Sequence, residues 1–107
     1  MTVAWSFHAK SQRAAILRTI ARRLSRNDAS RWNRKFHDAV LRLPDFPEMG
    51  SRIPDACFAT VPQNASRLRQ MRCSPYRIVY EVQGGQIHIL AIMHSRMLVR
   101  AYDTHWH

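Results

Sequence analysis

Cysteine and glycine are scarce in this chain of 107 residues, and so are acidic side chains and long apolar runs. The two cysteines, Cys57 and Cys73, lack C-x-x-C spacing and are too few for a disulfide framework. No apolar run approaches the roughly 20 residues of a membrane span. Residues 1–27 are basic and helix-patterned, without the central apolar block of a secretory signal. These absences predict a cytoplasmic protein with reduced thiols and no membrane partner.

The few glycines do not form any of the common nucleotide or nucleophile motifs. The patterns G-x-x-x-x-G-K-[ST], G-x-G-x-x-G and G-x-S-x-G are all missing, which argues against nucleotide hydrolysis, dinucleotide binding and esterase chemistry. His105 and His107 share a tail, but a structural zinc site needs four ligands and no cysteine or acidic partner is placed to complete one. We therefore expect no metal and no cofactor. His8 and His37 are expected to be solvated on helix flanks.

Positive charge dominates what is present. The chain has 17 Lys+Arg against 7 Asp+Glu, a formal net charge of +10, and 15 of the 17 are arginine. Residues 1–43 carry ten basic and two acidic side chains (net +8), and residues 44–107 carry seven and five (net +2). Arginine grips phosphate and carboxylate groups bidentately. The balance predicts a polyanionic partner, either nucleic acid or an acidic protein segment, with a merely solubilising surface as the alternative.

The periodicity predicts a short strand, two amphipathic helices, a loop and three further strands. The first strand ends near Ser6, a residue suited to cap a helix, and the helical pattern then runs from about His8 to Arg26. A break at residues 27–30 offers caps for the second helix, and Pro44 ends it. The later strands are expected at 68–72, 76–82 and 87–94, with Gly84-Gly85 as a two-residue hairpin turn.

That turn sets the expected pairing, from Val82 with Ile87 to Arg77 with Ile92. One face is then almost wholly apolar and receives the helices: Tyr76, Ile78, Tyr80, Val82, Ile87, Ile89, Ala91 and Met93. The other face, expected to be open, mixes charged and apolar residues: Arg77, Val79, Glu81, His88, Leu90, Ile92, His94 and then Arg96. We predict an α+β fold of one domain over residues 1–107, with 97–107 as a tail. An N-terminal strand and a helical hairpin pack on one face of an antiparallel sheet, in the order β-α-α-β-β-β.

The open face is the expected working surface, and its candidate target- or nucleic-acid-binding residues are Arg69, Arg72, Arg77, His94 and Arg96. Arginines hold a phosphodiester and stabilise the charge that builds on it during cleavage. Tyr102, six residues beyond Arg96, could exchange the proton of an attacking 2′-hydroxyl. RNA cleavage without metal is therefore one hypothesis, with Arg77, Arg96 and Tyr102 as catalytic residues.

Three segments resemble the RelE/ParE superfamily of bacterial toxins from type II toxin–antitoxin modules: Leu43-Pro-Asp-Phe-Pro-Glu-Met-Gly50, Leu68-Arg-Gln-Met-Arg-Cys-Ser-Pro-Tyr-Arg-Ile-Val-Tyr-Glu-Val82 and Ile89-Leu-Ala-Ile-Met-His-Ser-Arg96. The opening Val3-Ala-Trp-Ser6 fits the first strand of the superfamily, so the resemblance covers about residues 3–97. It implies a compact toxin that is neutralised by a co-expressed antitoxin with an acidic, partly disordered segment.

The superfamily divides by mechanism, and the 46–50 loop and 75–80 strand look more like its ParE branch. ParE-like members poison DNA gyrase, whereas RelE-like members cut messenger RNA in the ribosome. Arg77, Arg96 and Tyr102 match the ribonuclease branch, but Leu68 and Gln70 replace two lysines expected there; His105 or His107 could substitute. The leading hypothesis is thus a ParE-like growth inhibitor acting on gyrase. The alternatives are a ribosome-dependent endoribonuclease and a non-toxic basic domain that binds nucleic acid or a partner.

Overall fold

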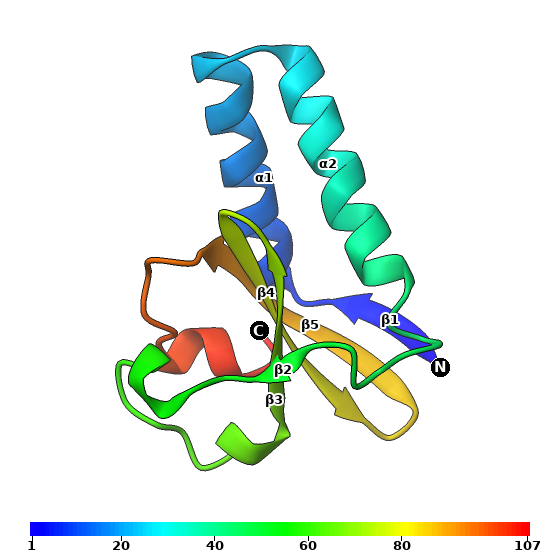
Figure 1. The fold of residues 1–107 in the computed structure, drawn as a ribbon, viewed down its shortest axis with the longest axis vertical. Coiled ribbons are helices and arrows are strands. Elements are labelled where there is room, and N and C mark those ends of the chain that lie inside the picture. Colours follow the sequence, from blue (N-terminus) through cyan, green and yellow to red (C-terminus); the bar gives the residue numbers. More distant parts are fainter.

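The computed structural model describes all residues from Met1 to His107. Two helices lie against one side of a five-stranded sheet (Figure 1). In chain order the elements are β1 (Thr2–Trp5), α1 (Phe7–Arg23), α2 (Arg26–Leu41), β2 (Ser51–Arg52), β3 (Leu68–Cys73), β4 (Tyr76–Gln83) and β5 (Gln86–His94). Short 3-10 helices follow β2, precede β3 and follow β5: η1 (Asp55–Cys57), η2 (Ala65–Arg67) and η3 (Ala101–Thr104).

The strand order is β1-β5-β4-β3-β2, and this arrangement confirms the predicted α+β fold. The sheet is mixed, because β1 runs parallel to β5 while the other neighbouring pairs are antiparallel. The very short β2, which pairs only with Arg69 and Gln70 of β3, was not expected from the sequence. No helix is both long and apolar enough to cross a membrane.

A serine caps the N-terminus of each helix. Ser6 caps α1 as predicted, with its hydroxyl accepting a hydrogen bond from the Ala9 N–H. The second helix starts at Arg26, earlier than the predicted break at residues 27–30, because Ser25 accepts from the Asp28 N–H. Hydrogen bonds from Ser25 and Arg31 lower the pKa of the Asp28 carboxyl. Residues 27–30 therefore form the first turn of α2 instead of the connection before it.

The hairpin between β4 and β5 turns at Gly84 and Gly85, which have φ of +56° and +77°, a backbone conformation that glycine adopts without steric cost. Val82 pairs with Ile87 as predicted, but Arg77 pairs with Met93 and not with Ile92. The register shifts because Val79 faces Ala91 while Tyr80 faces Ile89, which leaves Leu90 as an extra residue in β5.

This bulge reverses the predicted alternation beyond Leu90. Ile92 joins the core on the helix side, whereas Ala91 and Met93 join the core on the opposite side. Ser6 is bonded to the bulged strand: its N–H donates to the Ile89 carbonyl (2.9 Å) and its hydroxyl to the Leu90 carbonyl (3.2 Å). The residue that caps α1 thus also ties the helix to the irregular part of β5.

The face of the sheet away from the helices is covered, and the prediction of an open face is wrong. A second core of eight buried residues lies there: Ile53, Phe58, Leu68, Val79, Leu90, Ala91, Met93 and Val99. Phe58 and Val99 come from segments outside the main strands and form an isolated parallel bridge. The sequence offered few local signals for this layer, because its covering residues lie in irregular segments without periodicity.

Candidate functional site

Among the predicted binding residues, Arg77 is buried and bonded inside the protein. Its side chain is 4% exposed, one terminal nitrogen donates to Gln70 Oε1 (3.0 Å) and the other donates to the Ser95 carbonyl. Its Nε is buried without a partner. Arg72, the cross-strand neighbour of Arg77, is exposed and makes no side-chain hydrogen bond. The guanidinium of Arg77 therefore joins β3, β4 and the chain after β5.

His94 and Arg69 lie on the helix side of the sheet, away from Arg77. The bulge places His94 opposite Tyr76, with ring centroids 6.0 Å apart, although the sequence predicted it beside Arg77. Arg96 is exposed, and its backbone N–H donates to His94 Nδ1 (3.1 Å). Arg69 donates to the carbonyls of Gly50 (2.6 Å) and Glu48 (3.4 Å). The five residues thus do not share one face, and their role in target binding stays a prediction.

The three candidate catalytic residues have separate contacts. Tyr102 is 57% exposed, stacks on His107 with ring centroids 4.0 Å apart, and meets the ring of His8 edge-on at 4.7 Å. Arg77 instead contacts Gln70 and Ser95. Tyr102 forms no hydrogen bond or ring contact with Arg77 or Arg96. Their catalytic role stays a prediction.

The C-terminal segment is docked on the first turn of α1. His8 Nε2 lies 2.7 Å from the carboxylate of Asp103, and the His8 backbone N–H donates to the His107 carbonyl (2.7 Å). The Trp106 ring packs against His88, with centroids 4.7 Å apart. His8 was expected to be solvated, and that expectation is wrong because its partner lies 95 positions away in the chain.

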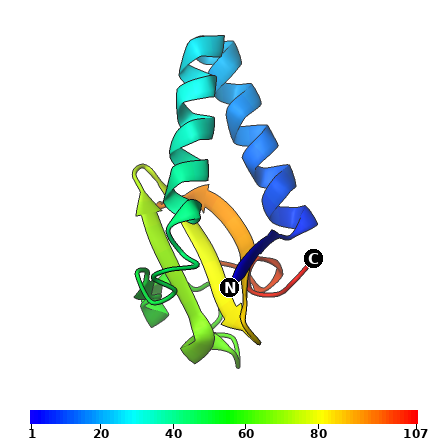
Figure 2. The ribbon, with the colours of Figure 1, turned by 90° about the vertical axis from the view of Figure 1, so that its right-hand side faces the viewer.

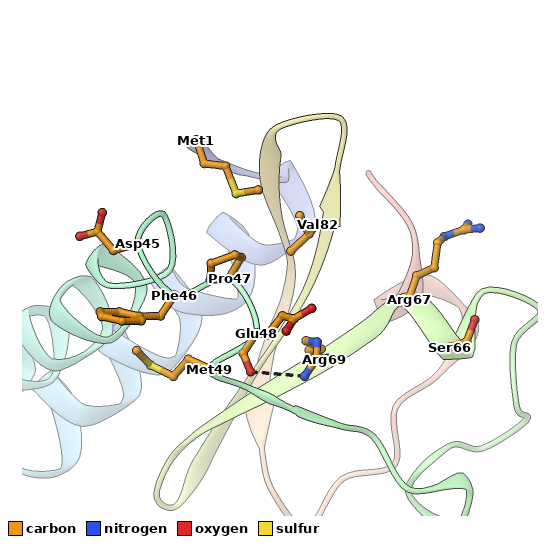
Figure 3. A pocket seen from close by; sticks show the side chains of 10 residues that line it. All are labelled: Met1, Asp45, Phe46, Pro47, Glu48, Met49, Ser66, Arg67, Arg69 and Val82. Atoms are coloured by element: carbon orange, nitrogen blue, oxygen red, sulfur yellow. Dashed lines mark hydrogen bonds between the residues drawn. The ribbon is translucent and has the colours of Figure 1, made fainter.

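A groove of about 980 Å³ lies beside β3, where the sequence predicted no pocket (Figure 3). Its apolar side chains belong to Met1, Phe46, Met49 and Val82. Polar and charged side chains line the remainder together with Pro47: Asp45, Glu48, Ser66, Arg67 and Arg69. Phe46 is 62% exposed and Met49 is 42% exposed, so the groove presents apolar surface to solvent.

Residues 45–50 form a loop that makes one wall of the groove, and the side chain of Tyr80 bonds this loop to the sheet. The Tyr80 hydroxyl accepts from the Gly50 N–H (2.9 Å) and donates to the Pro47 carbonyl (2.8 Å). Burial raises the pKa of this phenol. A Cβ on Gly50 would lie 2.7 Å from both the Gln70 carbonyl oxygen and the Tyr80 ring, so only glycine fits this close approach. The wall is thus held in place without a bound partner.

A loop that combines proline, phenylalanine and methionine after a helix is the one sequence feature that could have pointed to this groove. The segment from Phe46 to Gly50 contributed to the resemblance, but its position opposite β3 depends on contacts with Arg69 and Tyr80. Those residues are far from it in sequence, so local reasoning could not place them.

Comparison with solved structures finds the same fold in a chain from the chromosomal ParDE toxin–antitoxin system of P. aeruginosa. The two structures superpose with a TM-score of 0.69 at 21% sequence identity, over 88% of this chain and 95% of the other. No curated protein matches the sequence. The sequence model that describes the ParE toxin of the type II toxin–antitoxin system parDE matches residues 3–99. A match over nearly the whole length, with this fold, shows that the chain belongs to the ParE toxin family of type II toxin–antitoxin systems.

Proposed function

We propose that this toxin stops bacterial growth by acting on DNA gyrase and does not cut RNA. Membership of the ParE family over residues 3–99 supports the proposal, because the sequence resemblance associates the ParE branch with gyrase and the RelE branch with ribosomal messenger RNA. The toxin acts within a two-component system, so a cognate antitoxin is its natural inhibitor.

The state of Arg77 is the structural observation that favours the gyrase hypothesis over the ribonuclease. An arginine that holds a scissile phosphate has to present free donors to it. Both terminal nitrogens of Arg77 donate inside the protein, and the side chain is 4% exposed. Freeing them would leave the Ser95 carbonyl and the Gln70 side chain without partners, at a cost of about 1–3 kcal/mol.

Controlled induction in a bacterial host tests the proposal. Plasmid supercoiling and newly formed 5′ ends of RNA are measured in the same cells within minutes. We expect relaxed or cleaved DNA with intact messages. New cuts at codon boundaries with unchanged supercoiling would establish the ribonuclease instead, and the absence of any growth defect would leave a non-toxic binding domain.

A double variant, Arg96→Ala with Tyr102→Phe, sharpens this test. Both side chains are exposed, so the variant keeps its fold, unlike one that also changes the buried Arg77. Gyrase poisoning is expected to lose at most about tenfold in potency, which corresponds to about 1.4 kcal/mol, because Arg96 is one of five predicted target-binding residues. A nuclease that used Arg96 and Tyr102 would lose toxicity by orders of magnitude.

We further propose that the antitoxin inserts an amphipathic acidic segment into the groove beside β3. The exposed apolar side chains of Phe46 and Met49 offer anchor points, and the basic Arg67 and Arg69 line the groove on its other side, beyond Glu48 (Figure 3). Apolar anchors near the centre of an interface carry most of its binding energy. The net charge of +10 favours an acidic partner over a neutral one.

Substitution in the groove tests this assignment with the antitoxin encoded beside the toxin. Phe46→Glu combined with Met49→Glu is expected to weaken the complex at least tenfold by titration calorimetry. Met97→Glu combined with Leu98→Glu is the matched control, because these residues are also exposed and apolar but lie outside the groove. Equal weakening by both pairs would show that the groove is not the binding site.

A further inference from the structure

The half of the helical hairpin that lies away from the sheet is strongly basic. We define the distal hairpin as residues 18–34, which contain the end of α1, the connection and the start of α2. It carries six arginines and one aspartate, a net charge of +5: Arg18, Arg22, Arg23, Arg26, Arg31, Arg34 and Asp28. All six arginines are exposed. Figures 1 and 2 show this end of the hairpin projecting away from the sheet.

Most of this charge is not neutralised within the protein. Arg31 pairs with Asp28, the one acidic residue of the distal hairpin. The other five arginines make no salt bridge and no side-chain hydrogen bond, whereas Arg13, outside this segment, packs over Trp5 and donates to Asn33. Five guanidinium groups are therefore free to contact a partner.

Helix stability accounts for only part of this pattern. Arg22 and Arg23 lie in the last turn of α1, where the helix dipole favours cations. Arg26 is the first residue of α2, where the dipole disfavours a cation. Like charges this close also repel, at a cost that salt only partly screens. An anionic partner would offset both costs.

The chemistry of the distal hairpin fits a phosphate backbone better than a protein segment. Protein interfaces depend on buried apolar anchors, whereas DNA phosphates require only cations. Leu24 is the one large apolar residue that the distal hairpin leaves exposed, in contrast to the groove with Phe46 and Met49. Contacts from arginine to phosphate fix the position of a protein on a duplex but carry no sequence information directly.

We propose that the distal hairpin binds the phosphate backbone of duplex DNA without reading its sequence. The biological role of this surface rests on the proposed function, since a toxin that acts on gyrase encounters the DNA that gyrase holds. The groove and the distal hairpin then serve different partners, the antitoxin and DNA.

Binding of the full chain to a labelled 20-base-pair duplex tests the proposal, with anisotropy measured over a range of salt concentrations. The distal variant replaces Arg18, Arg22, Arg26 and Arg34 by glutamine, which has a similar helix propensity. The charge-matched control replaces four exposed basic residues outside the distal hairpin by glutamine: Lys10, Arg42, Arg52 and Arg100. A third variant carries lysine at the four distal positions, and circular dichroism checks that all are folded.

We expect the distal variant to bind at least tenfold more weakly, while the control and the lysine variant stay within about threefold of the unmodified toxin. The slope of log K against log salt should fall by about 0.9 for each phosphate contact that is lost. Unchanged affinity of the distal variant, equal losses in the distal and control variants, or no DNA binding by the unmodified toxin would each overturn the proposal. A distal variant that binds DNA normally but binds the antitoxin more weakly would also overturn it, because the partner of the distal hairpin would then be an acidic protein.

Gyrase supercoiling in the presence of the same variants separates this inference from the proposed function. Failure of the unmodified toxin to affect gyrase would refute the gyrase target, while the duplex titration would still decide the DNA surface. Conversely, the distal variant could inhibit gyrase fully and bind the duplex with unchanged affinity. That result would refute the DNA surface and leave the gyrase target standing.

Discussion

His8 and Asp103 join the two ends of the chain, with Nε2 of the imidazole 2.7 Å from the carboxylate. Gln12 donates to the same carboxylate oxygen from the next turn of α1 (3.3 Å), and its own carbonyl oxygen accepts from the Ile92 N–H of β5 (2.8 Å). Asp103 lies within η3, and its other carboxylate oxygen accepts from the N–H of Arg100, the residue before η3 (3.0 Å). This carboxylate therefore joins η3 to α1, and the Gln12 side chain joins α1 to β5.

Replacing His8 by alanine is expected to destabilise the toxin by about 1–3 kcal/mol, because the buried carboxylate of Asp103 loses a partner. Urea unfolding at neutral pH measures the change. His37→Ala, on the exposed side of α2, is the control and should cost less than about 0.5 kcal/mol. Equal stability of the two variants would show that the contact contributes nothing.

Removal of the Tyr80 hydroxyl is expected to destabilise the fold at neutral pH and to change its behaviour in alkali. Tyr80→Phe leaves the Gly50 N–H and the Pro47 carbonyl without their partner, at a cost of about 1–2 kcal/mol. Burial raises the pKa of the native phenol. Above about pH 10 the unfolded phenol has lost its proton and the native one retains it, so stability falls as pH rises.

The difference in unfolding free energy between the native chain and Tyr80→Phe should therefore shrink as pH increases beyond about 10. Tyr102→Phe provides the comparison, because its ring is 57% exposed and stacked on His107. A pH-independent difference for Tyr80→Phe would contradict the coupling between its burial and its ionisation.

An added methyl group at Gly50 is expected to distort the groove. The new Cβ would lie 2.7 Å from the Gln70 carbonyl oxygen and from the buried Tyr80 ring, neither of which has room to move. Gly50→Ala should cost about 1–3 kcal/mol of stability and weaken antitoxin binding. Thermal unfolding measures the stability and calorimetry measures the antitoxin binding. Ser51→Ala, at the exposed neighbouring position, should leave the stability and the binding unchanged.

Replacement of Arg77 by methionine should destabilise the protein by about 1–3 kcal/mol, since the Ser95 carbonyl and the Gln70 side chain lose their donors. Arg96→Met, at an exposed position, should cost less than about 0.5 kcal/mol. Soluble toxin in cell lysates and its melting temperature distinguish a folding defect from a catalytic one. Full stability of Arg77→Met together with lost toxicity would indicate that Arg77 acts on a substrate.

Local signals in the sequence determined the elements and most of their ends. Ser6 as a cap, the apolar face of α2 and the Gly84-Gly85 turn each depend on a few neighbouring residues, whose preferences are readable without the rest of the chain. The excess of arginine and the segments that resemble the superfamily also needed no structure. These features were enough to predict an α+β fold and a polyanionic partner.

The bulge at Leu90 was decided by tertiary structure, because the hydrogen bonds of Ser6 to Ile89 and Leu90 connect residues more than 80 positions apart. That single extra residue sends Ile92 and His94 to the helix side and breaks up the predicted cluster of charges. The second core, the docking of Asp103 on His8 and the groove held by Tyr80 arise in the same way. Sequence periodicity records which face of an element avoids water, whereas the choice of its partner depends on contacts between segments that are adjacent only after folding.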